Sequence, residues 1–113
     1  MIFMTEKDSK HRIGAHSFAK KYRDKMLNHA LLLDVREPKE WEIYHLEDAL
    51  LIPLQTLPEQ LDRLDPKRKI YVYCAHGVRS VYAVNFLYTC GYHQVVNVDG
   101  GLAEVSLYLD SSD

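Results

Sequence analysis

The sequence predicts an α/β domain built on a mainly parallel sheet, and two observations support this. Short, continuously apolar runs recur along the chain and are typical of strands that are buried on both faces of a parallel sheet. Segments with helical spacing or helix-capping residues lie between these runs, and this alternation indicates an α/β architecture. At 113 residues the chain has room for one hydrophobic core but not for two.

The first expected helix begins at Ser17. Phe18, Tyr22 and Met26 recur every fourth position behind that serine, which predicts an amphipathic helix with a serine cap. The run ALLLDV, residues 30–35, then predicts a strand that is buried on both faces.

The middle of the chain predicts two helices with a strand between them. Pro38 stands near the start of EPKEWEIYHL, where its missing N–H costs nothing, and Trp41 would be the buried anchor of that helix. The run LLIP predicts a strand that ends at Pro53. Thr56 and Glu59 then form a capping-box pattern. The second helix would begin there, and its apolar stripe would consist of Leu57, Leu61 and Leu64.

The second half repeats the alternation of strand and helix. The β-branched and aromatic run IYVY predicts a strand, and SVYAVNFLYTCGY predicts a helix with Gly91 at its C′ position. The run VVNV predicts a further buried strand, closed by Gly100 and Gly101. Binding sites of such sheets lie at the carboxyl ends of the strands, where we expect Asp34, Cys74 and Asp99.

Composition and charge limit the classes of partner and location. A net charge of -2 and a pI of about 6.3 do not favour nucleic acid or an anionic membrane as the main partner. No stretch is apolar enough to span a bilayer, and the first ten residues lack the apolar region of a signal peptide. We therefore expect a cytoplasmic protein whose two cysteines are free thiols. Cys90, late in a predicted helix, is expected to be a small core residue.

The stretch YVYCAHGVRS is the strongest candidate for a site, because its cysteine directly follows a strand and precedes a helix. A thiolate is the reactive form of cysteine, and helix N-termini and nearby cations lower its pKa from about 8.5. Gly77 lets the loop turn its amides inward, Arg79 adds a positive charge, and Ser80 can cap the helix. This pattern predicts an anionic sulfur at Cys74 beside an anionic substrate.

On these residues the chain resembles the rhodanese-like domain family in its single-domain form, from about Ser17 to Gly101. The motifs LLLDVREPKEW, HLEDALLIP, YVYCAHGVRS and GYHQVVNVDGG occur in the family's order. The resemblance implies a twisted, mainly parallel sheet with helices on both faces. We expect this domain to span residues 13–109, between flexible ends at 1–12 and 110–113. The family's loop Cys-x-x-Gly-x-Arg-Ser is matched at each fixed position by Cys74, Gly77, Arg79 and Ser80.

The resemblance also implies a sulfurtransferase. Cys74 would take a sulfane sulfur from a thiosulfate-like anion or a persulfide, and would pass it to cyanide or a thiol acceptor, including a protein acceptor. Asp34 and Arg36 would brace the site, unless they form a simple surface salt bridge. No cofactor, metal, nucleic acid or membrane is expected to take part. The residues expected to bind the substrate are Ala75, His76, Gly77, Val78, Arg79 and Ser80, with Arg79 holding the anionic donor.

Loop length and three departures refine the resemblance. Four residues separate Cys74 from Arg79, whereas the related phosphatases and arsenate reductases have one more, so this loop favours sulfur over phosphate. Tyr44 and Asp48 replace glycines of the family pattern, which predicts a modified turn. Val105 replaces a frequent tryptophan, which predicts different packing near the C-terminus.

Three other readings stay open. The first is a rhodanese-like module that binds a protein or carries sulfur without turnover, because fold alone does not establish activity. The second is a zinc site, since the sequence offers two thiolates and two imidazoles, although the helix between them would hold the pairs roughly 20 Å apart. The third is redox sensing by an accessible thiolate. The four residues of the zinc alternative are Cys74, His76, Cys90 and His93.

Overall fold

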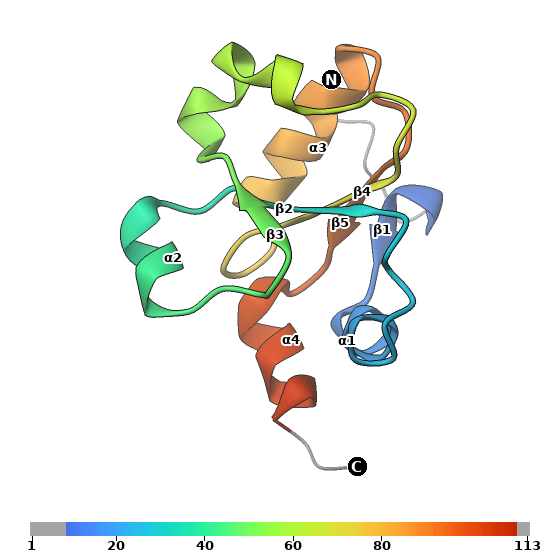
Figure 1. Cartoon of the computed structure of the whole chain (residues 1–113), viewed down its shortest axis with the longest axis vertical. Helices are drawn as coiled ribbons and strands as arrows, with labels where there is room; N and C mark the ends of the chain where they lie inside the picture. Colours follow the sequence, from blue (N-terminus) through green and yellow to red (C-terminus); the bar gives the residue numbers. More distant parts are fainter. Residues whose placement is uncertain (1–8, 111–113) are drawn as a thin grey trace.

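The computed structural model describes residues 9–110 and is built around one sheet in which every strand pair is parallel (Figure 1). The strand order β1-β5-β4-β2-β3 places the strand that precedes the cysteine loop in the middle. The predicted parallel sheet is thereby confirmed. Its strands are β1 (Arg12–Ile13), β2 (Leu31–Asp34), β3 (Ala49–Leu51), β4 (Ile70–Tyr73) and β5 (Val95–Val98).

Helices cover both faces of the sheet (Figure 1). The α-helices are α1 (Ala15–Arg23), α2 (Pro38–Ile43), α3 (Arg79–Thr89) and α4 (Gly101–Leu109). The 3-10 turns are η1 (Ser9–His11), η2 (Leu54–Glu59) and η3 (Leu61–Arg63). α1 packs against α4 on one face, while α3 packs against β4, β5 and η2 on the other.

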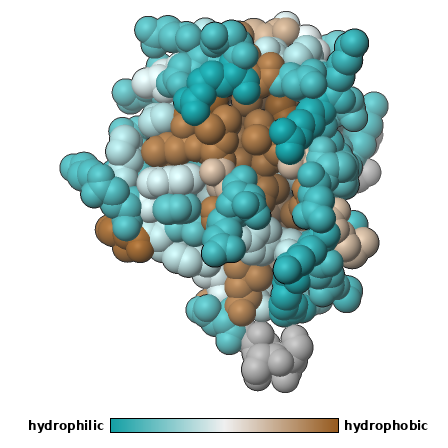
Figure 2. All heavy atoms as spheres, in the orientation of Figure 1, coloured by the Kyte–Doolittle hydropathy of each residue, from teal (hydrophilic) through white to brown (hydrophobic). Residues whose placement is uncertain are grey.

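The strand register produces two core layers. Leu32 pairs with Tyr71, and Tyr71 pairs with Val96, so these three side chains share the face covered by α1 and α4. Leu33 and Val72, one residue further on, point into the other layer. On the face seen in Figure 2, apolar side chains form a connected area framed by hydrophilic ones.

The first helix differs from its prediction. α1 begins at Ala15 with Gly14 as N-cap, so Ser17 lies inside the helix and the predicted serine cap is wrong. The buried stripe of α1 includes two alanines, which the spacing of large apolar residues did not reveal. Met26 lies beyond the helix end and is exposed.

Residues 38–64 contain two further corrections. Trp41 is only half-buried and stacks on His45, with ring centroids 3.6 Å apart, so it is not the buried anchor of α2. η2 and η3 replace the expected leucine-striped helix because Pro58 lies inside this segment and removes a backbone donor. Thr56 binds the Pro53 carbonyl instead of forming the expected capping box.

The end of α3 follows its prediction, but the cysteine there does not. Gly91 has a φ of +97°, and its N–H donates to the Tyr88 carbonyl at 3.1 Å. The N–H of Tyr92 donates to the Leu87 carbonyl at 2.9 Å, which completes a Schellman motif. Cys90 is exposed, so its expected place in the core is wrong.

The predicted flexible ends lie largely outside the described residues. Residues 1–8 and 111–113 of these predicted ends are not described by the structure. Residues 9–11 form η1, and Arg12 begins β1. At the other end, α4 continues to Leu109. Among residues 9–110, no helix has the length and apolar character that crossing a membrane requires.

Asp48 is expected to destabilise the fold through its backbone conformation. Its φ is +70°, a region that costs a residue with a Cβ atom free energy. We expect Asp48→Gly to raise the free energy of unfolding by about 0.5–1 kcal/mol, measured by urea denaturation. Asp24→Gly is the matched control: φ there is −83°, so the same change should lower stability. Equal effects at both positions would contradict this explanation.

Candidate active site

Cys74 lies at the carboxyl end of β4, and its side chain is buried with 1% exposed. Its sulfur accepts a hydrogen bond from the Gly77 N–H at 3.1 Å and another from the Ser80 N–H at 3.3 Å. The Ser80 hydroxyl oxygen lies 3.4 Å from the same sulfur. The loop and the first turn of α3 therefore surround the sulfur with donors.

These donors decide the ionisation of the thiol. Burial alone raises the pKa of Cys74, because it disfavours the charged form. Hydrogen bonds from the Ser80 hydroxyl and from the backbone N–H groups of Ser80, His76 and Gly77 outweigh burial, so the pKa of Cys74 lies below its ordinary value. The site is built to hold a thiolate.

The loop is held from behind by the start of α4. The Leu102 N–H donates to the Cys74 carbonyl at 2.8 Å, and the Ala103 N–H donates to the Ala75 carbonyl at 3.0 Å. Because these carbonyls point toward α4, the amides that follow are free to turn toward the sulfur. Close approach of the two segments requires a glycine at Gly101, where a Cβ atom would lie 2.6 Å from the Ala75 carbonyl.

Arg79 does not stand free beside the sulfur. Its two terminal nitrogens donate to the two carboxylate oxygens of Glu40 at 2.7 and 2.9 Å, in a bidentate pair that joins α3 to α2. The Arg79 guanidinium holds the pKa of Glu40 at about 2. The negative charges of Glu40 and of Cys74 raise the pKa of Arg79 in turn.

Asp34 and Arg36 form a buried pair, so the alternative of a surface salt bridge is wrong. Asp34 is 0% exposed and Arg36 is 6% exposed. Arg36 donates to Asp34 through its backbone N–H and its guanidinium, at 2.8–3.1 Å, and donates to the Tyr44 carbonyl at 2.7 Å. Burial and the Asp34 carboxylate raise the pKa of Tyr73 beside them. This network fixes the chain that leaves β2.

The remaining predicted site residues have different surroundings. The N–H of His76 supports the thiolate, while the Val78 side chain is 64% exposed at the N-cap of α3. The hydroxyl of Ser80 reaches the sulfur and not the helix end, so its predicted capping role is wrong. Asp99 turns toward β1 and pairs with Arg12 at 2.8 Å.

The sequence did not indicate a role in the site for Glu40, Gly100 or Gly101. The double glycine after a strand was visible in the sequence, but nothing there showed that it would touch the cysteine loop. For Glu40 the sequence carries no comparable signal, because its partner lies 39 positions away.

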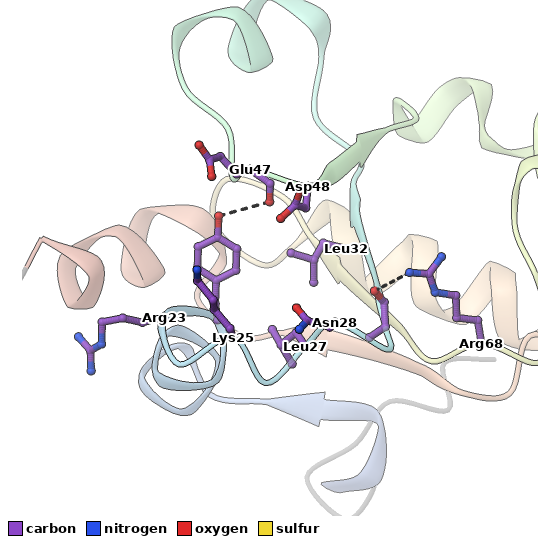
Figure 3. Close-up of a pocket in the computed structure, with 10 residues that line it drawn as sticks. Arg23, Lys25, Leu27, Asn28, Leu32, Glu47, Asp48 and Arg68 are labelled. Atoms are coloured by element: carbon purple, nitrogen blue, oxygen red, sulfur yellow. Dashed lines mark hydrogen bonds between the residues drawn. The ribbon is translucent and has the colours of Figure 1, made fainter.

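Two hollows must be distinguished. One of about 230 Å³ opens beside the cysteine loop and is lined by Ala75 and His76, among others. A larger one, of about 480 Å³, is shown in Figure 3. Leu32, Asp48 and Arg68 line it, and they lie at the amino ends of β2, β3 and β4. The larger hollow therefore lies at the amino ends of the strands, whereas Cys74 lies at their carboxyl ends.

The two Cys-His pairs considered for zinc do not meet. Within residues 9–110, no group of three or more histidine, cysteine, aspartate or glutamate side chains is placed to hold a metal ion. Cys74 is buried before α3, and Cys90 is exposed after it.

Comparison with known proteins identifies the family. The family model described as the rhodanese-like domain matches residues 16–107. The chain is a rhodanese-like domain protein. A crystal structure of a rhodanese-related protein from Thermoplasma volcanium matches with a TM-score of 0.75 and 32% identity, covering 86% of this chain and 91% of that one. The predicted family and fold are thereby confirmed.

Relatives of this rhodanese-like protein carry different names. A protein of Allochromatium vinosum named sulfurtransferase is 35% identical over 64% of this chain and 67% of its own length. A Chlamydia caviae protein named tRNA uridine(34) hydroxylase is 36% identical over 79% of this chain. The chain spans only 30% of that second relative's length.

Proposed function

We propose that this rhodanese-like protein is a sulfurtransferase that carries a sulfane sulfur on Cys74. The observation that supports this most strongly is the buried sulfur of Cys74, which accepts hydrogen bonds from the Gly77 and Ser80 amides and has a lowered pKa. A thiolate held in this way is the nucleophilic form of cysteine, and the lowered pKa favours it. A cytoplasmic location, where thiols stay reduced, is part of the same proposal.

The proposed reaction has two steps. In the first, the Cys74 thiolate attacks the outer sulfur of thiosulfate; an S–S bond to Cys74 forms, the bond to the sulfonyl sulfur breaks, and its electron pair leaves with sulfite. In the second, cyanide or a thiolate attacks the outer sulfur of the persulfide. Cyanide leaves as thiocyanate, a thiolate leaves as a persulfide, and the Cys74 thiolate is restored. Charge balances in both steps without a cofactor.

The other site residues have supporting roles in this proposal. The inward amides of the loop stabilise the negative charge that moves between Cys74 and the outer sulfur, as an oxyanion hole does. Arg79 is the cation available to an anionic donor once Glu40 releases it. Asp34 and Arg36 keep the neighbouring loop in place, and they do so without solvent exposure.

The test is the intact mass of the protein after incubation with thiosulfate, followed by cyanide. A gain of one sulfur that is discharged as thiocyanate supports the proposal. A gain that cyanide cannot remove supports the alternative of a sulfur carrier that needs its own protein acceptor. No gain with thiosulfate or with a persulfide rejects sulfur transfer and favours a protein-binding module.

A second candidate follows from the relative named tRNA uridine(34) hydroxylase. In this alternative the domain is one part of a machinery that modifies uridine 34 of tRNA, and sulfur transfer is not its task. Hydroxylation of that uridine by the purified chain, measured by nucleoside mass spectrometry, would favour this candidate over the sulfurtransferase.

Ser80→Ala is expected to shift the pH dependence of Cys74 toward higher pH. The Ser80 hydroxyl stabilises the thiolate, so its removal raises the pKa of Cys74 and fewer thiolates form at neutral pH. Alkylation of Cys74 by iodoacetamide, followed by peptide mass spectrometry, should show a higher midpoint with the same rate at high pH. Ser106→Ala, in the hollow beside the loop, is the control and should leave the midpoint unchanged.

A further inference from the structure

Glu40 is paired with Arg79, the cation that an anionic donor would need. Both terminal nitrogens of Arg79 donate to its carboxylate, at 2.7 and 2.9 Å, and each side chain is about one-third exposed. Glu40 is itself fixed by the capping box of α2, in which the Glu37 N–H donates to its Oε1 atom at 2.9 Å. The carboxylate is therefore held in place by its own helix as well as by Arg79.

The charge of Glu40 is permanent under working conditions. Its pKa of about 2 keeps the carboxylate ionised at neutral pH. Its charge also acts on Arg36, whose pKa it helps to raise, although Arg36 is already paired with Asp34. In the described part of the chain, Arg36 and Arg79 beside the cysteine loop thus both have carboxylate partners, and neither guanidinium is left uncompensated.

This pairing penalises doubly charged donors more than singly charged ones. A donor that uses Arg79 must displace Glu40 and then remain near its negative charge. Coulomb repulsion is proportional to the charge of the donor, so thiosulfate, a dianion, meets about twice the repulsion of a monoanion. Partial exposure weakens the effect without changing this ratio.

We propose that Glu40 determines the class of sulfur donor by restraining Arg79, so that the site favours monoanionic sulfane donors over dianionic ones. Organic thiosulfonates and simple alkyl persulfides are such monoanions. This inference rests on the proposed sulfur transfer and adds the donor class to it. With a thiosulfonate the Cys74 thiolate takes the outer sulfur and a sulfinate leaves with the electron pair. The same bonds form and break as with thiosulfate, and the donor and the leaving group each carry one negative charge fewer.

Glu40→Gln tests the proposal with two matched donors, thiosulfate and benzenethiosulfonate, and thiocyanate formation as the readout. Glutamine can keep the capping box while it removes the charge. We expect kcat/KM for thiosulfate to rise on the order of tenfold, mainly through KM, and that for benzenethiosulfonate to rise about threefold, the square root of the first factor. The rise for thiosulfate should shrink as salt is added.

Two controls isolate the ion pair. Glu42→Gln removes the same charge from an exposed position of the same helix, and it should leave both donors within about twofold of wild type. In an Arg79→Ala background, Glu40→Gln should give a smaller rise with thiosulfate than in the wild type, because the repulsion is relieved but no guanidinium is left to release. Arg79→Ala alone should weaken the use of thiosulfate.

The outcomes separate this inference from the function on which it rests. Equal factors for the two donors, or an equal rise with Glu42→Gln, would overturn the role of Glu40 and leave Cys74 transfer intact. If the wild type moves sulfur from neither donor, the sulfurtransferase proposal fails first, and the donor preference fails with it.

Discussion

Cys74→Ser is expected to abolish sulfur transfer without unfolding the domain. A serine hydroxyl is not ionised at neutral pH and cannot take a sulfane sulfur, so thiocyanate formation should fall by at least about a thousandfold. The smaller oxygen can still accept the Gly77 and Ser80 N–H bonds that now end on the sulfur. Intact mass after thiosulfate should therefore show no added sulfur, while the thermal melting curve stays close to that of the wild type.

Cys90→Ser is the matched control for this experiment. Cys90 is exposed at the far end of α3, whereas Cys74 is buried among donors at its start. We expect Cys90→Ser to keep full activity and to gain one sulfur. If the Cys74→Ser protein gained a sulfur, or the Cys90→Ser protein failed to gain one, Cys90 rather than Cys74 would carry the sulfur. Either result would refute the proposed mechanism.

The strands were predictable from the sequence because burial on both faces leaves little room for polar residues. β2, β4 and β5 follow apolar runs closely, and β3 overlaps the run LLIP but begins one residue earlier, at Ala49. The first strand was missed because it has two residues, Arg12 and Ile13, and no run can be seen in two positions. Its place in the sheet depends on pairing with Asn97 and Val98, far along the chain.

The site was predictable where its chemistry is local and hidden where it depends on long-range contacts. The motif that predicts a thiolate loop lies within seven positions and consists of Cys74, Gly77, Arg79 and Ser80. The pairing of Arg79 with Glu40 joins two helices that the sequence places far apart. The same limit applies to buried side chains: no local pattern shows that α2 would leave Trp41 half-exposed.

Gly101→Ala is the second change for which we expect a large effect on activity. φ at Gly101 is +65°, and an added Cβ atom would lie 2.6 Å from the Ala75 carbonyl and from the His76 nitrogen. Because these are backbone atoms, the cysteine loop must move. The His76 N–H helps to lower the pKa of Cys74, so a shift of about 1 Å should cost activity on the order of a hundredfold and raise that pKa.

Gly91→Ala separates this effect from simple backbone strain. φ at Gly91 is +97°, but no atom lies within 4 Å of the added Cβ, so only the conformational cost of roughly 1–3 kcal/mol applies. Both variants should lose stability in urea denaturation, and only Gly101→Ala should lose sulfur transfer and shift the alkylation midpoint of Cys74 to higher pH. Equal activity losses would mean that the contact between α4 and the cysteine loop supports the fold alone. A loss confined to Gly101→Ala would instead show that α4 sets the position of the amides on which the thiolate depends.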